Sequence, residues 1–204
     1  MDDIVKQAMS KWPDVPAVYG WLGLDRRGNW LIKGERISNP VVADFISRNY
    51  EHDDAGRWFF QNGPQRVFVA LAYTPLVYRI RWDSDPKAPL RIEAHTGLVV
   101  HQVDSAWIDD GGILLLVTEQ GAGMVDDRDL DRLLPCFVDK TGNALMGEAI
   151  AEMIERSQAG GDAGLYFCYR EHTVPVTAVA SADIPAKSGF MQRPVQPAGQ
   201  EECY

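Results

Sequence analysis

The sequence predicts an α+β protein made of two related β-rich units, in which hairpins are covered by short helices. Three observations lead to this fold class. Short runs rich in β-branched and aromatic residues alternate with glycine-bearing turns along the 204 residues. Only a few segments carry apolar residues at helical spacing. A strand-turn-strand pattern at 24–32 recurs at 108–116, a constant offset of 84 positions, which indicates an internal duplication.

The first unit, expected over residues 1–82, opens with a β-hairpin. Its strands are the apolar runs 21–24 and 30–32, and the polar segment 25–29 lies between them. Gly28 in that segment can adopt a positive φ angle, as a tight turn requires.

A short helix is expected next, at roughly 40–49. Pro40 suits its first position, because the missing N–H of proline has no helical partner there, and Ser38 or Asn39 can cap it. The residues that recur at helical spacing are Val41, Val42, Phe45 and Ile46.

A second hairpin is predicted from the strands 57–60 and 66–71. The segment Asn62-Gly63-Pro64 separates them, and Asn-Gly is a strong signal for a hairpin turn. A further strand, 76–82, follows a turn at 73–75.

A second unit is expected over residues 90–180, after the acidic, proline-bearing segment 83–89, which reads as a linker. Helices are expected at 126–135, where aspartates can cap the first turn, and at 141–157, which has a strong apolar stripe. Its predicted strands are 90–94, 98–100, 106–108, 113–117, 165–169 and 174–179.

Residues 181–204 are expected to form an extended tail on the surface. The segment has few large apolar groups, and three prolines remove backbone donors. Truncation after Ala180 is therefore predicted to leave stability unchanged.

Composition excludes several classes of function. The 20 basic and 29 acidic residues give a net charge of -9, which disfavours nucleic acids and anionic membranes as partners. The chain has no apolar run long enough to span a bilayer and does not begin with a signal-peptide pattern, so a cytoplasmic location is expected. The three cysteines have no disulfide or zinc spacing and are expected to be free thiols.

Catalytic and cofactor motifs are absent from the sequence. It contains no GxGxxG, GxxxxGK[ST], HExxH or GxSxG pattern, so no cofactor is expected and no catalytic residue is assigned. His95 and His101 could form a paired metal site, but scattered surface histidines are the simpler interpretation. No metal site is therefore predicted.

One polar cluster, in residues 56–66, has the composition of a ligand site. Arginine forks bind phosphate or carboxylate, amides recognise polar edges, and a tryptophan can stack on a planar ring. The candidate ligand-binding residues are Arg57, Trp58, Gln61, Asn62, Gln65 and Arg66, with the neighbouring Arg79. The alternative is a structural hairpin, in which the arginines pair with Glu51, Asp53 or Asp54.

Residues 20–30, 48–50 and 56–67 resemble an uncharacterised proteobacterial domain-of-unknown-function family, most specifically in the run WFFQNGPQRV. No activity comes with this resemblance. The order of short motifs is similar to that of a second unknown-function family, at Asp25-Gly28-Trp30, Gly56-Trp58, Pro64-Val67-Val69 and Pro75-Leu76-Val77. This second resemblance implies a duplicated β-rich core, a second half like a pleckstrin-homology fold, and a pocket for a nucleotide-like ligand.

The expected function is a cytoplasmic, non-enzymatic binding or regulatory module for a small anionic or nucleotide-like ligand. The alternatives are a protein-interaction scaffold without a small ligand and an enzyme with an unrecognised site.

Overall fold

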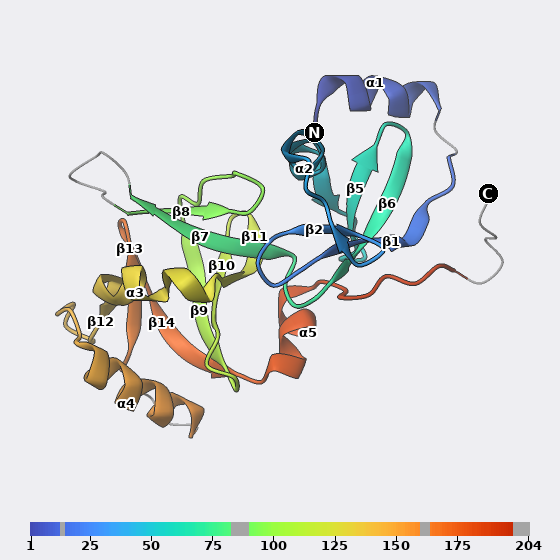
Figure 1. The fold of residues 1–204 in the computed structure, drawn as a ribbon. Coiled ribbons are helices and arrows are strands. Elements are labelled where there is room, and N and C mark those ends of the chain that lie inside the picture. The colour runs from blue at the N-terminus through green and yellow to red at the C-terminus, as the bar shows by residue number, and fades with distance from the viewer. Residues whose placement is uncertain (13–14, 83–89, 160–163, 198–204) are drawn as a thin grey trace. The chain divides into compact units, whose positions relative to one another are not determined.

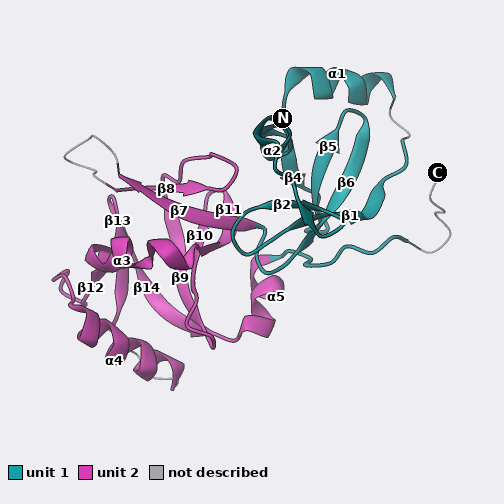
Figure 2. Cartoon of the chain, viewed as in Figure 1, with its two compact units in different colours: residues 1–75, 189–204 teal, residues 76–188 magenta. Residues whose placement is uncertain are grey.

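The chain forms two compact units, which Figure 2 colours separately. Unit 1 comprises Met1–Pro75 and Gly189–Tyr204, and unit 2 comprises Leu76–Ser188. Both contain helices and a β-sheet, which confirms the predicted α+β fold class. The structure is a computed structural model that describes residues 1–12, 15–82, 90–159 and 164–197.

Figure 1 labels the elements along the chain. In unit 1 they are α1 (Asp3–Lys11), β1 (Val18–Leu24), β2 (Trp30–Ile32), β3 (Glu35–Arg36), α2 (Pro40–Arg48), β4 (Tyr50–His52), β5 (Trp58–Asn62) and β6 (Gln65–Leu71). In unit 2 they are β7 (Leu76–Trp82), β8 (Leu90–Ala94), β9 (Val103–Asp109), β10 (Leu114–Thr118), β11 (Gly121–Val125), η1 (Asp127–Asp129), α3 (Leu130–Leu133), η2 (Leu134–Cys136), β12 (Phe137–Val138), α4 (Gly147–Gln158), β13 (Tyr166–Tyr169), β14 (His172–Val179), η3 (Ser181–Asp183) and α5 (Ile184–Ser188).

The sheet of unit 1 has the strand order β3-β2-β1-β6-β5-β4. Its neighbouring strands run antiparallel except β1 and β6, which run parallel. The predicted helix is confirmed as α2, and Asn39 caps it by accepting a hydrogen bond from the Val41 N–H at 2.9 Å. Helix α2 packs on one face of the sheet, where the rings of Phe45 and Phe60 meet edge to face with centroids 5.5 Å apart.

The sheet of unit 2 has the order β12-β13-β14-β9-β10-β11-β7-β8. The pairs β9/β14 and β7/β11 run parallel, and the other neighbours run antiparallel. The Tyr169 hydroxyl on β13 donates to the Val100 carbonyl and accepts from the Ile92 N–H on β8, both at 3.1 Å. Since β8 and β13 lie near opposite ends of the strand order, the sheet must curl to bring them together (Figure 1).

The two sheets share one topology, which confirms that the units are related. The order β3-β2-β1-β6-β5-β4 of unit 1 matches β11-β10-β9-β14-β13-β12 of unit 2 strand by strand, including the single parallel pair at its centre. A short capped helical segment follows the first three strands in both units. Unit 2 differs by the additional strands β7 and β8 beyond β11.

A repeated aspartate turn supports the duplication at the level of single atoms. In the first copy the Asp25 N–H donates to the Asn29 carbonyl, and the Gly28 N–H donates to the Asp25 carbonyl. The Asp25 carboxylate accepts from the backbone N–H groups of Arg27 and Asn29, both at 2.8 Å. The glycine has a φ of 71°. The same four hydrogen bonds and a positive-φ glycine recur in the turns Asp53–Arg57, Asp109–Ile113 and Asp139–Asn143.

Two elements of unit 2 differ from the sequence-based expectation. The helix expected at 141–157 is α4, which begins only at Gly147, because residues 139–143 form the fourth aspartate turn. The glycine-rich strand β11 was not anticipated, since glycine has a low strand propensity. Gly123 is required there because a Cβ at this position would lie 2.5 Å from Cε2 of Tyr78.

The boundary between the units also differs from the expected one. The strand 76–82 was assigned to the first unit, but as β7 it pairs with β8 and β11 and belongs to unit 2. The expected linker, 83–89, lies outside the described residues.

The prediction of an extended tail from residue 181 is wrong for residues 181–192. Residues 181–188 form η3 and α5, and Ile184 is fully buried. The chain then returns to unit 1, where Phe190 is buried and the Met191 N–H donates to the Gly56 carbonyl at 2.8 Å. The Gln192 carbonyl accepts from the Leu71 N–H, also at 2.8 Å. Composition missed this packing because two large apolar side chains suffice for it.

Candidate functional site

Unit 1 contains a pocket of about 520 Å³ between α2 and one face of the sheet. Nine apolar side chains and two amides line it. They are Val18, Trp21, Leu22, Ile32, Val42, Phe45, Ile46, Phe60, Asn62, Gln65 and Val67. The pocket is open to solvent, because Trp21, Ile32 and Val42 remain 44%, 45% and 40% exposed.

The duplicated copy closes the equivalent face. The cross-strand pair Leu22/Ile32 corresponds by register to Ala106/Leu116 in unit 2, and Leu116 is fully buried. Asn62, paired with Gln65, corresponds to Tyr169, paired with His172, and Tyr169 is buried.

Tyr169 explains how this closure arises. Its hydroxyl bonds to the backbone of residues 92 and 100, which belong to the β8 region that only unit 2 has. In the described part of unit 1 no strand follows β3 in the sheet order, and the small Asn62 occupies the tyrosine position. The open pocket is therefore a property that distinguishes unit 1 from its copy.

Two residues of the predicted site, Asn62 and Gln65, lie in this pocket. They face each other at the end of the β5–β6 hairpin, beside the turn at Gly63, whose φ is 58°. The Gln65 amide donates to the Pro16 carbonyl at 3.2 Å. The exposed Asn62 amide has no hydrogen-bond partner among the described residues, so it can bond to a ligand.

The arginines of the predicted hairpin site lie on the opposite face of the sheet. Side chains alternate along a strand, so Arg66 points away from the face that carries Gln65. Its guanidinium lies over the Phe59 ring at 4.7 Å, and that of Arg57 lies over Phe68 at 4.7 Å. Neither arginine lines the pocket.

Arg57 is already paired within its own turn. Its Nη2 lies 2.6 Å from Oδ2 of Asp53, and its Nε donates to the same oxygen at 2.8 Å. The pKa of Asp53 is lowered despite burial, because it accepts hydrogen bonds from Arg57. This is the structural role that the sequence left open. Among the described residues no carboxylate pairs with Arg66.

Trp58 and Gln61 are buried and do not reach a ligand. The Trp58 ring packs against Tyr50, with centroids 4.8 Å apart. The Gln61 amide donates to the Gly63 carbonyl at 2.9 Å and so supports the hairpin turn.

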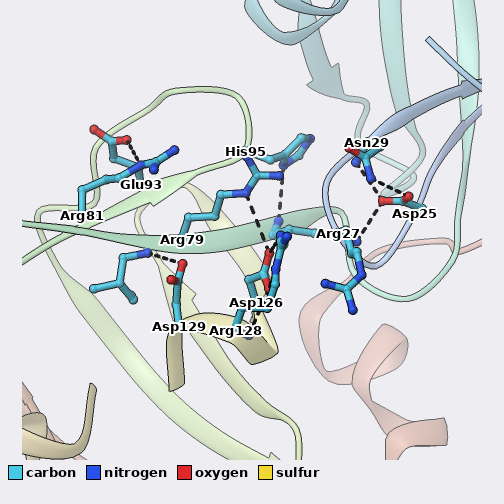
Figure 3. Close-up of polar contacts among 12 residues, drawn as sticks. Asp25, Arg27, Asn29, Arg79, Arg81, Glu93, His95, Asp126, Arg128 and Asp129 are labelled. Atoms are coloured by element: carbon cyan, nitrogen blue, oxygen red, sulfur yellow. Dashed lines mark hydrogen bonds and ion pairs between the residues drawn. The ribbon is translucent and has the colours of Figure 1, made fainter. Parts of the chain in front are cut away.

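Arg79 belongs to unit 2, where it lies in an ion-pair cluster around the buried Asp126 (Figure 3). Its Nε is 4.0 Å from Oδ2 of Asp126, and Arg128 makes closer contacts with the same carboxylate. Hydrogen bonds from the Arg128 guanidinium lower the pKa of Asp126 to about 2. The structure therefore does not group Arg79 with the hairpin residues in one unit.

Replacing Asp126 with asparagine is expected to lower the free energy of unfolding at pH 7 by about 1–2 kcal/mol. A carboxylate whose pKa falls on folding stabilises the native state above its ordinary pKa of 3.8, and this stabilisation is lost as the pH falls toward 2. The exposed Arg128 partner keeps the effect moderate. Urea unfolding at pH 7, 5 and 3 should show the difference shrinking with acid. The exposed Asp131 provides a matched control, D131N, and equal curves for wild type and D126N would contradict the prediction.

Other candidate centres find no support within the part of the chain that the structure describes. No group of three or more His, Cys, Asp or Glu side chains is arranged to hold a metal ion there. His95 accepts a hydrogen bond from the Val77 N–H, whereas His101 contacts Arg170, so the two histidines have separate partners. No helix in this part is long and apolar enough to cross a membrane.

The pocket residues that the sequence did not reveal are Trp21, Ile32 and Val42. They come from two strands and a helix, and only the tertiary structure brings them together. One signal was available: two consecutive valines open α2, more apolar residues than a single buried stripe needs.

Fold and site thus define a duplicated α+β protein with an open apolar pocket in one of its two units. Over residues 1–195 the sequence matches the family described as "Protein of unknown function (DUF2946)", and the chain belongs to that family. This confirms the expectation of a family of unknown function.

The fold is similar to that of solved proteins from another family. A DUF1285 family protein from Silicibacter pomeroyi DSS-3 matches with a TM-score of 0.55 at 13% identity, covering 81% of this chain and 85% of that one. A DUF1285 family protein from Shewanella baltica OS155 has a TM-score of 0.43 at 18% identity, covering 55% and 88%. The first similarity shows a common fold. No match was found among curated proteins.

Proposed function

We propose that this protein is a cytoplasmic, non-enzymatic binding module whose unit 1 pocket takes a small molecule with an apolar body and an anionic group. The open apolar pocket carries the proposal. Its volume of about 520 Å³ lies within the range of roughly 300–1,000 Å³ typical of small-molecule sites. The lining contains no charged side chain, so the enclosed part of the ligand is uncharged.

Lys33 supports an anionic group at the edge of the pocket. Its Nζ lies 3.8 Å from the ring centroid of Trp21, which lines the pocket. No carboxylate in the described part of the chain forms an ion pair with Lys33. An ammonium group held on an aromatic ring without a counterion attracts anions. This keeps the anionic ligand predicted from the sequence but moves its cation from the hairpin arginines to Lys33.

A cytoplasmic location is supported by the thiols of Cys136 and Cys168, which are free in the structure. Unpaired cysteines are usual in a reducing compartment.

Two fluorescent probes of matched shape test the proposal: 1-anilinonaphthalene-8-sulfonate and the neutral N-phenyl-1-naphthylamine. Both should bind the folded protein. Val42→Asp should weaken both at least tenfold, because it places a charge in the apolar lining. Lys33→Gln should weaken only the sulfonate, by about threefold, as expected for an exposed ion pair.

The matched control is Val41→Asp. Val41 is the preceding residue of α2, is 73% exposed and does not line the pocket. Both substitutions lie in the first turn, where aspartate is favourable for the helix. Equal affinities for V42D and wild type, or equal losses for V41D and V42D, would contradict the pocket. Loss of sulfonate binding in Arg66→Ala alone would return the site to the hairpin arginines.

A further inference from the structure

Two cysteines of unit 2 lie opposite each other at the edge of its sheet. The antiparallel register of β12 and β13 pairs Phe137 with Phe167 and Val138 with Tyr166. One step further along the same register, Cys136 falls opposite Cys168. The rings of Phe137 and Phe167 are in contact, with centroids 5.6 Å apart, which shows that side chains of this register meet across the strands.

The duplicated unit supports this pairing. By register, Cys136 and Cys168 correspond to Asn49 and Gln61 of unit 1. There the Gln61 N–H donates to the Asn49 carbonyl at 2.8 Å, so the two backbones are direct cross-strand neighbours. Opposite residues in antiparallel strands have Cα atoms about 4.5–5.5 Å apart. Disulfides span Cα distances of about 4.4–6.8 Å, so the pair can be joined without moving the backbone.

The two thiols also influence each other. Burial, and the proximity of Cys168, raise the pKa of Cys136 to about 11. Cys136 is thus protonated at neutral pH and is a poor first nucleophile. Both cysteines are only partly buried, so a small oxidant can reach the pair.

We propose that Cys136 and Cys168 form a redox modification site, in which a small-molecule disulfide oxidises them to an intrachain disulfide. The Cys168 thiolate attacks one sulfur of the small disulfide, forms a mixed disulfide and releases one small thiol. Cys136 loses its proton, attacks Sγ of Cys168 and releases the second small thiol. Two protein thiols are oxidised, and one small disulfide is reduced to two thiols.

The closed bond would join the end of η2 to β13. The loop between the two cysteines contains β12 and α4, so the bond fixes one edge of the sheet and restricts the unfolded chain.

The test uses the full chain with Cys203→Ser, which leaves only this pair, and oxidised glutathione at neutral pH. Intact mass should fall by about 2 Da without an attached glutathione, and both titratable thiols should disappear. The melting temperature should rise by roughly 5 °C and return to its starting value on reduction.

Two further variants in the same background resolve the order of attack. Cys136→Ser should stop at the mixed disulfide on Cys168, and Cys168→Ser should react much more slowly. A stable glutathione adduct on the unsubstituted pair, a disulfide-linked dimer, or two thiols that remain unreacted in the folded protein would each overturn the proposal. None of these outcomes bears on the pocket of unit 1.

Discussion

Removing residues 181–204 is expected to reduce the free energy of unfolding by about 4 kcal/mol or more, the opposite of what composition suggests. The truncation deletes the buried Ile184 from unit 2 and the buried Phe190 from unit 1. Loss of one large buried apolar side chain costs about 2–5 kcal/mol. The backbone hydrogen bonds of Met191 and Gln192 to unit 1 are lost as well. Urea unfolding followed by tryptophan fluorescence measures the change.

Two controls separate this packing from a general effect of shortening. Truncation after Pro197 keeps all of the contacts named above and should change stability by less than about 0.5 kcal/mol. Phe190→Ala should cost about 3–5 kcal/mol, whereas Met191→Ala, at a half-exposed position, should cost much less. If the chain ending at Ala180 unfolded at the same urea concentration as the full chain, residues 181–192 would contribute nothing to folding.

The second large effect is expected from Gly56→Ala. Gly56 has a φ of 71°, and a Cβ on it would lie 2.0 Å from the carbonyl oxygen of Gly189. The obstacle is backbone, so no side-chain rotation relieves the overlap. The 189–191 segment would have to leave its place, with loss of the Met191 hydrogen bond to Gly56. We expect a loss of about 4 kcal/mol or more, measured by chemical denaturation.

The repeated turn supplies a closely matched control, Gly142→Ala. Gly142 holds the same position in the fourth aspartate turn, with a φ of 85°, but a Cβ there meets nothing within 4 Å. This variant therefore reports the cost of a left-handed alanine alone, about 1–2 kcal/mol. Similar losses in the two variants would show that the 189–191 segment yields easily at Gly56.

Local patterns predicted much of the fold. The hairpin around residues 25–29 and helix α2 depend on a turn glycine, a cap and apolar spacing, all of which are written within ten residues of sequence. The offset of 84 between repeats was visible for the same reason, because Asp25 and Asp109 make the same hydrogen bonds. The parallel pairing of β1 with β6 and the return of residues 189–192 depend on contacts distant in sequence.

The candidate site was predicted only in part, for a similar reason. The 56–66 hairpin was recognised, but its composition does not say which face of the strand meets a cavity. Alternation places Asn62 and Gln65 in the pocket and turns Arg57 and Arg66 away from it. The apolar side of the pocket comes from α2 and β1, whose distance from the hairpin no local pattern encodes.

The discontinuity of unit 1 has a consequence for synthesis on the ribosome. Residues 76–188 of unit 2 are translated between the two parts of unit 1. At roughly 5–20 residues per second this takes on the order of ten seconds. During that interval the nascent unit 1 lacks Phe190, and its Gly56 carbonyl and Leu71 N–H have not yet met their partners. Unit 2 can fold first although unit 1 begins the chain, and the incomplete unit 1 is then the form that a nascent-chain chaperone encounters.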